Sequence, residues 1–296
     1  MKIGIIGAGA IGMLFGAYLA EAKHEVTFLV RKNNENEKLY IEKKHNAPKL
    51  IHCKQVSEIE LLESMDLIIV AVKYHHLGQL KVGLDSLPKQ TPLLFIQNGL
   101  LHLSYVEQLK QETIAIGSVL HGASKVNPTT VSHLGIGLTT VGILKGLRKK
   151  VDMLIESSSD MFPIQFTSNI EQILFRKALL NCLINPLTTI AKVQNGELIK
   201  NESYFIILRN MYDELMGAFE GWQELLTWED VVELCKQTEY NRSSMLADYE
   251  KGRLMEIDTI VGAVIGEARK RDKILPVLNT FYLLLQEMNK VGDCNY

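Results

Sequence analysis

Apolar and polar residues alternate along the first half of the chain in a rhythm of short strands and longer helical stretches. Five apolar runs rich in β-branched residues have the length and bounds of strands: KIGIIG, EVTFLV, DLIIVAV, PLLFIQ and TIAIGSVL. Strands that alternate with helices are typical of βαβ units and of a parallel sheet. We therefore expect an α/β fold for this half.

Two stretches of the first half depart from that rhythm. Residues 33–58 are polar and rich in lysine, and we expect a solvated loop there with at most one short strand. Between residues 124 and 146, glycine and β-branched residues are mixed in VSHLGIGLTTVGIL, which predicts further strands in a hairpin at the edge of the sheet.

The second half of the chain has a helical pattern. After about Ser168 the apolar positions recur at helical spacing almost to the end. The clearest helical segments are ESYFIILRNMYDELMGAFEGWQEL, TWEDVVELCKQT, EIDTIVGAVIGEARKRD and VLNTFYLLLQEM. The pattern predicts an α/β domain over residues 1–168, followed by an all-α domain over residues 169–296.

The opening segment, MKIGIIGAGAIGMLFGAYLAEA, has no charged residue from Ile3 to Ala20. A basic start, an apolar run and small residues also outline a secretory signal or a membrane helix. The glycines argue against both, because each costs a helix about 1 kcal/mol relative to alanine. They fit instead the G-x-G-x-x-G turn of a Rossmann-type dinucleotide-binding domain, which joins a strand to a helix, here over about residues 11–22. The cofactor-binding residues predicted by this turn are Gly7, Gly9, Ala10, Ile11 and Gly12.

Three further side chains follow predicted strands, whose carboxyl ends hold the cofactor in such folds. Arg31 ends the second strand, where NAD-specific proteins carry an acid, and no carboxylate occurs before Glu35. An arginine can pair with a 2′-phosphate, which favours NADPH over NADH, although a solvated charge at a strand end is the alternative. Lys73 and Asn98 follow the third and fourth strands and are expected to face the same crevice; Asn98-Gly99 also fits a plain turn.

The segment LFRKALLNCLINPL is the most informative part of the second half. On a helix, Lys177, Asn181 and Asn185 share one face, and apolar residues cover the rest. A buried stripe of one ammonium and two carboxamides must be satisfied by protein groups, water or a ligand. A polar seam between domains and a substrate pocket both remain open on this segment alone.

Two features accompany the stripe. Pro186 cannot donate a hydrogen bond to the carbonyl of Cys182, so we expect the helix to bend or end there. Further along, NRSSMLADYEKGRLMEID offers Ser244, Glu256 and Asp258 as partners for the lysine.

Composition restricts the partners of the chain. Its 296 residues are 47% hydrophobic and 22% charged, and a net charge of -2 leaves no basic footprint for nucleic acid or a membrane surface. Four cysteines without C-x-x-C spacing indicate neither a disulfide framework nor a zinc site and favour the cytoplasm. His75 and His76 are expected to point apart as surface or loop residues. The apolar C-terminal helices leave surface that a second subunit could cover, as in a homodimer.

Several motifs together resemble the ketopantoate reductase (2-dehydropantoate 2-reductase) family over nearly the whole chain. They are GAGAIG, AVK ending at Lys73, QNG around Asn98, HLGIG at residues 133–137, RKALLNCLINPLT from Arg176, QNGEL at Asn195 and SSMLADYEKGRLMEID from Ser243. The first motif is shared with many dehydrogenases, whereas the last three together are specific.

The resemblance implies reduction of a 2-oxo acid by NADPH. Lys177 would be the general acid that protonates the ketone oxygen, Glu256 would orient it, and Lys73 would serve the cofactor side. Hydride addition builds negative charge on the oxygen, which an ammonium can neutralise by proton transfer without a metal. The substrate-binding residues implied are Asn98, Asn181, Asn185, Asn195 and Ser244.

This chain departs from the family pattern near the glutamate. The family usually reads TEIDxING there, whereas Met255 and Val261 stand here for Thr and Asn, and Asp272 replaces a glycine. Three hypotheses follow: a ketopantoate reductase of pantothenate and coenzyme A biosynthesis, a reductase of another branched 2-oxo acid, and a binding protein that senses NADP(H) without turnover. The presence of the lysine, asparagine, serine and glutamate named above argues against the third.

Overall fold

The computed structural model describes residues 1–31, 39–43 and 48–293. The chain forms two compact units, the first made of Met1–Gln97 and His102–Glu171, the second of Asn98–Leu101 and Gln172–Tyr296. The short segment Asn98–Leu101 therefore groups with the second unit, whereas the sequence pattern predicts a single division after residue 168. The expected α/β part and the expected helical part are both present.

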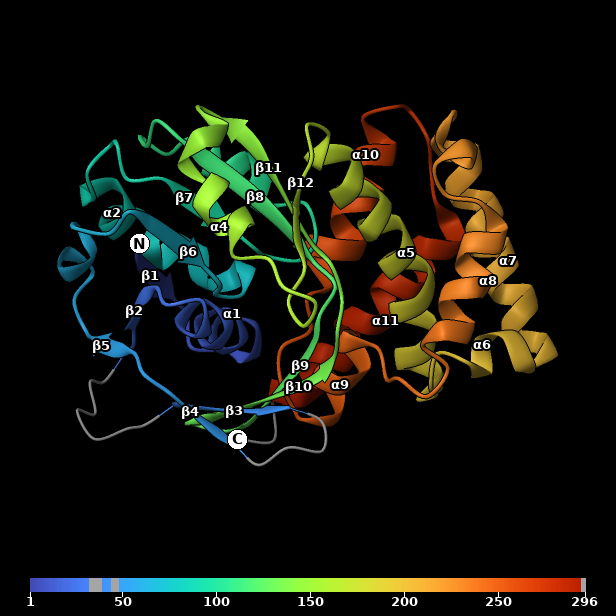
Figure 1. Ribbon diagram of the computed structural model, residues 1–296. Coiled ribbons are helices and arrows are strands. Elements are labelled where there is room, and N and C mark those ends of the chain that lie inside the picture. Colours follow the sequence, from blue (N-terminus) through green and yellow to red (C-terminus); the bar gives the residue numbers. More distant parts are fainter. Residues whose placement is uncertain (32–38, 44–47, 294–296) are drawn as a thin grey trace. The chain divides into compact units, whose positions relative to one another are not determined.

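An eight-stranded sheet is the framework of the first unit (Figure 1). Its order is β12 (Ile164–Phe166), β11 (Thr139–Lys145), β8 (Ile114–Val119), β7 (Leu93–Phe95), β6 (Leu67–Val70), β1 (Lys2–Ile6), β2 (Glu25–Leu29) and β5 (Lys54–Val56). All neighbours are parallel except β11 and β8, and Ile5 of β1 pairs with Phe28 on one side and Ile69 on the other. The strand order reverses at β1, and dinucleotides bind at such a point, beyond the carboxyl ends of the strands.

Helix α1 (Ala10–Glu21) explains why the opening segment carries no charge. It lies between the main sheet and a second sheet, so every residue from Gly12 to Leu19 is buried (Figure 1). Gly16 allows close contact with the main sheet, because a Cβ there would lie 2.2 Å from the ring of Phe28. The second sheet has the order β4 (Lys49–Ile51), β3 (Leu39–Lys43), β10 (Thr130–Gly135) and β9 (Gly122–Asn127).

The second sheet corrects two expectations. The described parts of residues 33–58 contain three strands, β3 and β4 in the second sheet and β5 in the main sheet. β3 forms there because Leu39 and Ile41 are buried in the same core as α1. Residues 32–38 and 44–47 lie outside the described residues. The expected hairpin does form, from β9 and β10, but in the second sheet, and β11 alone returns to the edge region of the main sheet.

Short helices complete the first unit. They are α2 (Leu77–Ser86), α3 (His102–Val106) and α4 (Asp152–Glu156), with 3-10 turns at Ile59–Leu62, Tyr74–His76 and Arg148–Lys150.

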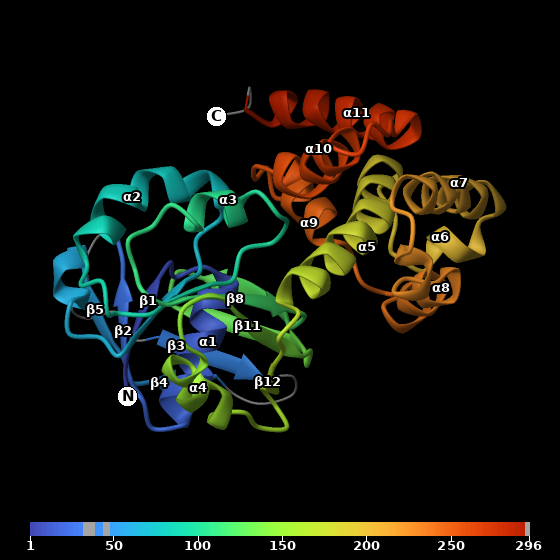
Figure 2. The same cartoon turned by 90° about the horizontal axis from the view of Figure 1, so that it is seen from above.

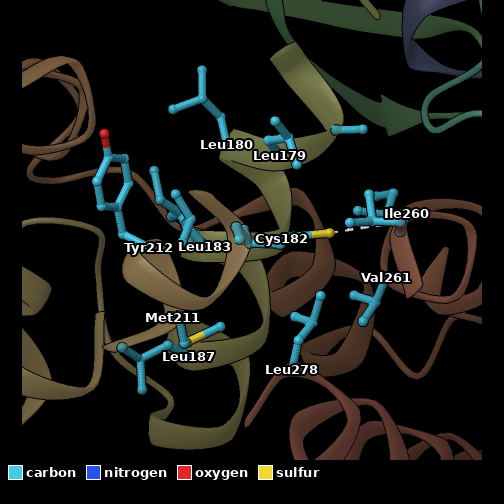
Figure 3. Close-up of a cluster of buried hydrophobic side chains, with 14 of the residues drawn as sticks. Leu179, Leu180, Cys182, Leu183, Leu187, Met211, Tyr212, Ile260, Val261 and Leu278 are labelled. Atoms are coloured by element: carbon cyan, nitrogen blue, oxygen red, sulfur yellow. Dashed lines mark hydrogen bonds between the residues drawn. The ribbon is translucent and has the colours of Figure 1, made fainter. Parts of the chain in front are cut away.

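The second unit is built around α5 (Ile170–Ala191). In Figure 2, α6, α7 and α8 lie on one side of α5, and α9, α10 and α11 lie on the other. The bounds are α6 (Glu197–Lys200), α7 (Glu202–Ala218), α8 (Trp228–Gln237), α9 (Ser244–Glu250), α10 (Ala263–Arg269) and α11 (Pro276–Asp293), with a 3-10 turn at Trp222–Glu224 and a π-helical turn at Asp258–Gly262. Leucine and other apolar side chains from α5, α7, the π-helical turn and α11 meet in one core (Figure 3).

Helix α5 continues through Pro186 to Ala191, so of the two expectations for the proline, a bend or an end of the helix, the end is wrong. The threonines that follow support the backbone of this turn. Thr188 donates its hydroxyl to the carbonyls of Ile184 (2.8 Å) and Asn185 (3.1 Å), and Thr189 donates to Asn185 (2.6 Å). Within the described residues, no helix is both long and apolar enough to cross a membrane.

Candidate active site

The turn between β1 and α1 has the geometry that a dinucleotide requires. Gly7 has a φ of 111°, a conformation that favours glycine, and a Cβ on Gly12 would lie 2.0 Å from the Gly7 carbonyl oxygen. A Cβ on Gly9 would meet no atom within 4 Å, so the backbone there is open to a ligand. No side chain caps α1, whose first residues are Ala10 and Ile11, and its N-terminal N–H groups can meet a phosphate. The cradle therefore fits the pyrophosphate of a dinucleotide.

Basic side chains gather at the carboxyl ends of β2 and β6. Arg31 follows β2 and is exposed, whereas Lys73 follows β6 and is partly buried. Burial lowers the pKa of His76, and the positive charges of Arg31 and Lys73 lower it further. The three groups are thus near enough to interact, and together they suit an anion such as a 2′-phosphate.

The structure corrects the expectation for the two histidines at this edge. His75 and His76 do not point apart: they share a tight 3-10 turn, and their ring centroids are 4.1 Å apart. Glu35, the first acidic residue after the second strand in the sequence, lies outside the described residues.

Lys125 is a cationic neighbour of the glycine turn that the sequence pattern does not reveal. It lies on β9, and its Nζ donates to the carbonyl oxygen of Ala8 at 2.9 Å. This contact places a positive charge beside the cradle. Because the two residues are 117 positions apart, only the packing of the second sheet brings them together.

Gln97 is a second residue that sequence reasoning missed. Its Nε2 donates to the carbonyl oxygens of Val70 at 2.9 Å and Val72 at 3.0 Å, at the end of β6. It therefore fixes the backbone that carries Lys73. Its Oε1 is buried and has no hydrogen-bond partner among the described residues.

In the second unit, Asn98 connects the two residues expected to carry the chemistry. Lys177 Nζ donates to Asn98 Oδ1 at 2.9 Å, and Asn98 Nδ2 donates to Glu256 Oε2 at 3.2 Å. An ammonium can only donate and a carboxylate can only accept, so these partners fix which way the amide points. We call this arrangement the Lys177–Asn98–Glu256 network; the chain positions that it joins are up to 158 residues apart.

The environment of Lys177 prepares it to release a proton. Burial lowers its pKa from 10.5 to about 8, and the carboxylate of Glu256 opposes this by favouring the charged form. The side chain therefore remains an ammonium at neutral pH while its pKa lies close to that pH. This combination suits a general acid.

The two asparagines of the predicted stripe lie on α5 with Lys177. Asn181 is partly buried, and Asn185 is only 4% exposed. The Asn185 Nδ2 has no hydrogen-bond partner among the described residues. A buried donor of this kind is costly to leave unpaired, so it favours a polar ligand or water at this face.

Other predicted residues have different surroundings. Ser244 is exposed as the first residue of α9, whose N-terminus is capped by Ser243. Asn195 is buried and donates from Nδ2 to Thr238 Oγ1 at 2.9 Å, which ties the start of α6 to the end of α8.

Asp258 is not a partner of the lysine, contrary to the expectation from the sequence. Its Oδ1 accepts hydrogen bonds from Tyr282 at 2.7 Å and Gln286 at 2.6 Å, so it holds α11 instead. Among the described residues, no group of three or more histidine, cysteine, aspartate or glutamate side chains could hold a metal ion.

Comparison with known proteins decides the family. Residues 3–146 match the family model described as ketopantoate reductase PanE/ApbA, and residues 169–289 match that of its C-terminal part. The chain belongs to the ketopantoate reductase family. A 2-dehydropantoate 2-reductase of Listeria innocua is 34% identical to it, over 97% of this chain and 96% of that protein. The enzyme of the same name from Bacillus subtilis is 31% identical over 90% and 91%.

Solved structures of the family and of a related dehydrogenase share the fold. A probable 2-dehydropantoate 2-reductase from Bacillus subtilis superposes with a TM-score of 0.87 at 30% identity, over 97% of this chain and all of that one. D-mandelate dehydrogenase, in a ternary structure with NADH and anilino(oxo)acetate, gives a TM-score of 0.86 at 26% identity over 99% of each chain. The fold thus serves proteins that are named for different substrates.

The departures from the family pattern have structural explanations. Met255 and Val261 are buried in the apolar core of the second unit, where apolar side chains are favoured. Asp272 has a φ of 54°, in the left-handed region that glycine adopts without strain, which explains a glycine in the family at this position.

Proposed function

We propose that this chain reduces the ketone of 2-dehydropantoate to the alcohol of pantoate with NADPH, a step of pantothenate and coenzyme A biosynthesis. The observation that carries the proposal is the Lys177–Asn98–Glu256 network, which holds an ammonium with a pKa of about 8 by a 2.9 Å hydrogen bond. Membership of the ketopantoate reductase family, and relatives of 31% and 34% identity that are named for this reaction, support the choice of substrate.

Lys177 is the proton donor in this proposal. When bound, the reduced nicotinamide supplies a hydride to the carbonyl carbon. The Lys177 ammonium stabilises the charge that develops on the carbonyl oxygen, transfers a proton to it and becomes a neutral amine, which then regains a proton from solvent. Glu256 keeps this lysine charged at neutral pH, and Asn98 Oδ1 fixes one of its N–H directions.

The polar face of α5 is proposed to recognise the substrate. The unpaired Nδ2 of Asn185 is a buried donor for a carboxylate or hydroxyl oxygen, and Asn181 lies one helical turn from it. Asn98 has a second N–H on Nδ2 beyond the one that it gives to Glu256. Ser244 and Asn195 complete the proposed substrate set on the strength of the family resemblance alone.

The cofactor is proposed to lie on the glycine turn of the first unit. Gly7, Gly9 and Gly12 form the pyrophosphate cradle, and Arg31 with Lys73 supplies positive charge for the 2′-phosphate of NADPH. This arrangement favours NADPH, whereas D-mandelate dehydrogenase was solved with NADH.

A second candidate function is the reduction of another branched 2-oxo acid. The likeness to D-mandelate dehydrogenase, at a TM-score of 0.86, favours keeping this candidate. The proton donor would act in the same way on any 2-oxo acid, so the two candidates differ only in the pocket beside it.

We propose further that the protein is a cytoplasmic homodimer. The second unit exposes apolar residues such as Leu283 and Leu284 on α11, which a second copy could cover. The proposed cytoplasmic location is supported by Cys182 and Cys235, which are buried as free thiols. Light scattering coupled to size-exclusion chromatography gives the mass: twice that of the chain is expected, and a monomer at all concentrations contradicts the homodimer.

The proposed function is tested by following NADPH oxidation with a panel of 2-oxo acids. The panel contains 2-dehydropantoate, 2-oxoisovalerate and phenylglyoxylate, each with NADPH and with NADH. The highest kcat/KM is expected for 2-dehydropantoate with NADPH. A higher value for another acid favours the second candidate, and no oxidation with any acid refutes both.

A further inference from the structure

The π-helical turn Asp258–Gly262 begins two residues after Glu256 and has backbone groups that bond outside the helix. A π-helical turn is wider than an α-helical turn, and such turns are often found at functional sites. The carbonyl oxygen of Thr259 accepts from the N–H of Leu100 at 2.9 Å. The carbonyl oxygen of Ile260 accepts from the Cys182 thiol at 3.6 Å, as the dashed line in Figure 3 shows. The turn is therefore bonded both to α5 and to the segment Asn98–Leu101.

Thr259 makes the closest contact with this segment. Its side-chain hydroxyl donates to the backbone carbonyl oxygen of Asn98 at 3.1 Å, and the residue is only 3% exposed. Gly99 has a φ of 76°, and a Cβ there would lie 2.0 Å from the carbonyl oxygen of Thr259. Segment and turn thus fit together so closely that only glycine is accommodated between them.

The Asn98 side chain depends on this fit. It must meet two partners on different elements, at 2.9 Å and 3.2 Å, and hydrogen bonds weaken steeply when distance or angle departs from the optimum. The backbone of Asn98 therefore has to be held in place within a fraction of an ångström. Thr259 supplies two of the described contacts that hold it, through the hydroxyl to Asn98 itself and through the carbonyl to Leu100.

We infer that Thr259 is a positioning residue for the proton transfer: its hydroxyl and carbonyl hold the segment Asn98–Leu101 so that the Asn98 amide stands between Lys177 and Glu256. The inference rests on the proposed function of that network. It assigns to Thr259 a role that acts through Asn98, without contact with the substrate.

The test uses Thr259→Val, which removes the hydroxyl and keeps the shape and the backbone carbonyl. Loss of the hydroxyl lets Asn98 move away from Lys177, and the misplaced donor is expected to lower kcat about tenfold. The KM for NADPH should stay within about twofold, because the glycine cradle lies in the first unit. Thr259→Ser keeps the hydroxyl and should restore the rate. Thr259→Ala compared with Thr259→Ser gives the same contrast with smaller side chains if the valine variant does not fold.

A second readout needs neither cofactor nor substrate. The reactivity of Lys177 toward acetic anhydride, measured across pH by peptide mass spectrometry on the full chain, gives its pKa directly. The wild type should titrate near 8. Thr259→Val should titrate lower, because a hydrogen bond to Asn98 Oδ1 favours the charged lysine.

Thr140→Val is the matched control. Thr140 is similarly buried and accepts a hydrogen bond from Gln165 at 3.2 Å, but it lies on β11 of the first unit. It should lose stability without a change in kcat or in the pKa of Lys177. If Thr259→Val behaves as this control does, the inference is overturned. If Lys177 shows the expected pKa change but no 2-oxo acid oxidises NADPH, the positioning role stands and the proposed function fails.

Discussion

Replacing Glu256 by glutamine removes the negative charge beside Lys177 while keeping an oxygen that can accept from Asn98 Nδ2. The wild-type lysine has a pKa of about 8, because burial lowers it and Glu256 opposes that effect. Lys177 donates its proton only as an ammonium, so kcat/KM should be high below about pH 8 and should fall as the pH rises through that value. Without the carboxylate the pKa is lower, and the fall should begin at a lower pH.

The size of this change follows from the geometry of the network. The amide of Asn98 joins the two charges by hydrogen bonds of 2.9 Å and 3.2 Å. A separation of about 5 to 8 Å and an effective dielectric constant of about 20 give an attraction of about 2 to 3 kcal/mol. At about 1.4 kcal/mol per pKa unit, the basic limb of the profile moves about two pH units toward acid. At pH 7.5 the rate should fall more than about tenfold, and at pH 5.5 it should approach that of the wild type.

The assay is NADPH oxidation at low substrate concentration between pH 5.5 and 9.5. Glu267→Gln is the control, because it removes one negative charge from α10 of the same unit, where Lys270 and Arg271 pair with it. It should leave the basic limb in place. A Glu256→Gln profile lowered equally at every pH, with its basic limb still near 8, would show that this carboxylate does not set the pKa of the donor.

Three further predictions concern single side chains. Arg31→Ala should raise the KM for NADPH about 10- to 100-fold and leave that for NADH unchanged, since only NADPH has a 2′-phosphate; equal use of both cofactors by the wild type contradicts this. Lys125→Met should weaken NADPH and NADH binding to the same extent, about three- to tenfold in a fluorescence titration, because both cofactors have the pyrophosphate that is proposed to lie beside Ala8. A loss of affinity confined to NADPH would show that Lys125 acts on the 2′-phosphate instead. Asp272→Gly should raise the free energy of unfolding by about 0.5 to 1 kcal/mol, because a φ of 54° strains a residue with a Cβ; a thermal melt at or below the wild-type temperature is the opposing result.

Local patterns were enough to predict the framework of the first unit. The glycine turn and the apolar strands β1, β2, β6, β7 and β8 each carry their signal within a few residues. The strands β3 and β4 of the second sheet have no such signal, because each is short and includes a lysine. They are strands only because β3 pairs with β10, β4 pairs with β3, and both pack against α1.

The residue types of the candidate site could be predicted from the sequence, but the hydrogen bonds that join these residues could not. Lys177 stands out as an ammonium on an apolar helix. Glu256 was one of three possible partners for it in the sequence, and the family resemblance gave it the orienting role. The bridging role of Asn98 spans 79 and 158 residues, so it requires the folded chain. Asp258 has the same chemistry as Glu256 and lies two residues away, yet it bonds Tyr282 and Gln286 on α11, a difference that spacing alone does not show.

The central claim is that Lys177 protonates the oxygen of a 2-oxo acid, and a single-turnover measurement of Lys177→Ala tests it most directly. Protein saturated with NADPH is mixed with 2-dehydropantoate, and cofactor binding is measured separately by fluorescence. The account predicts an NADPH affinity within about twofold of the wild type and a rate of oxidation lower by about 10² to 10⁴-fold. A Lys177→Ala variant that binds NADPH and oxidises it at close to the wild-type rate would contradict the account.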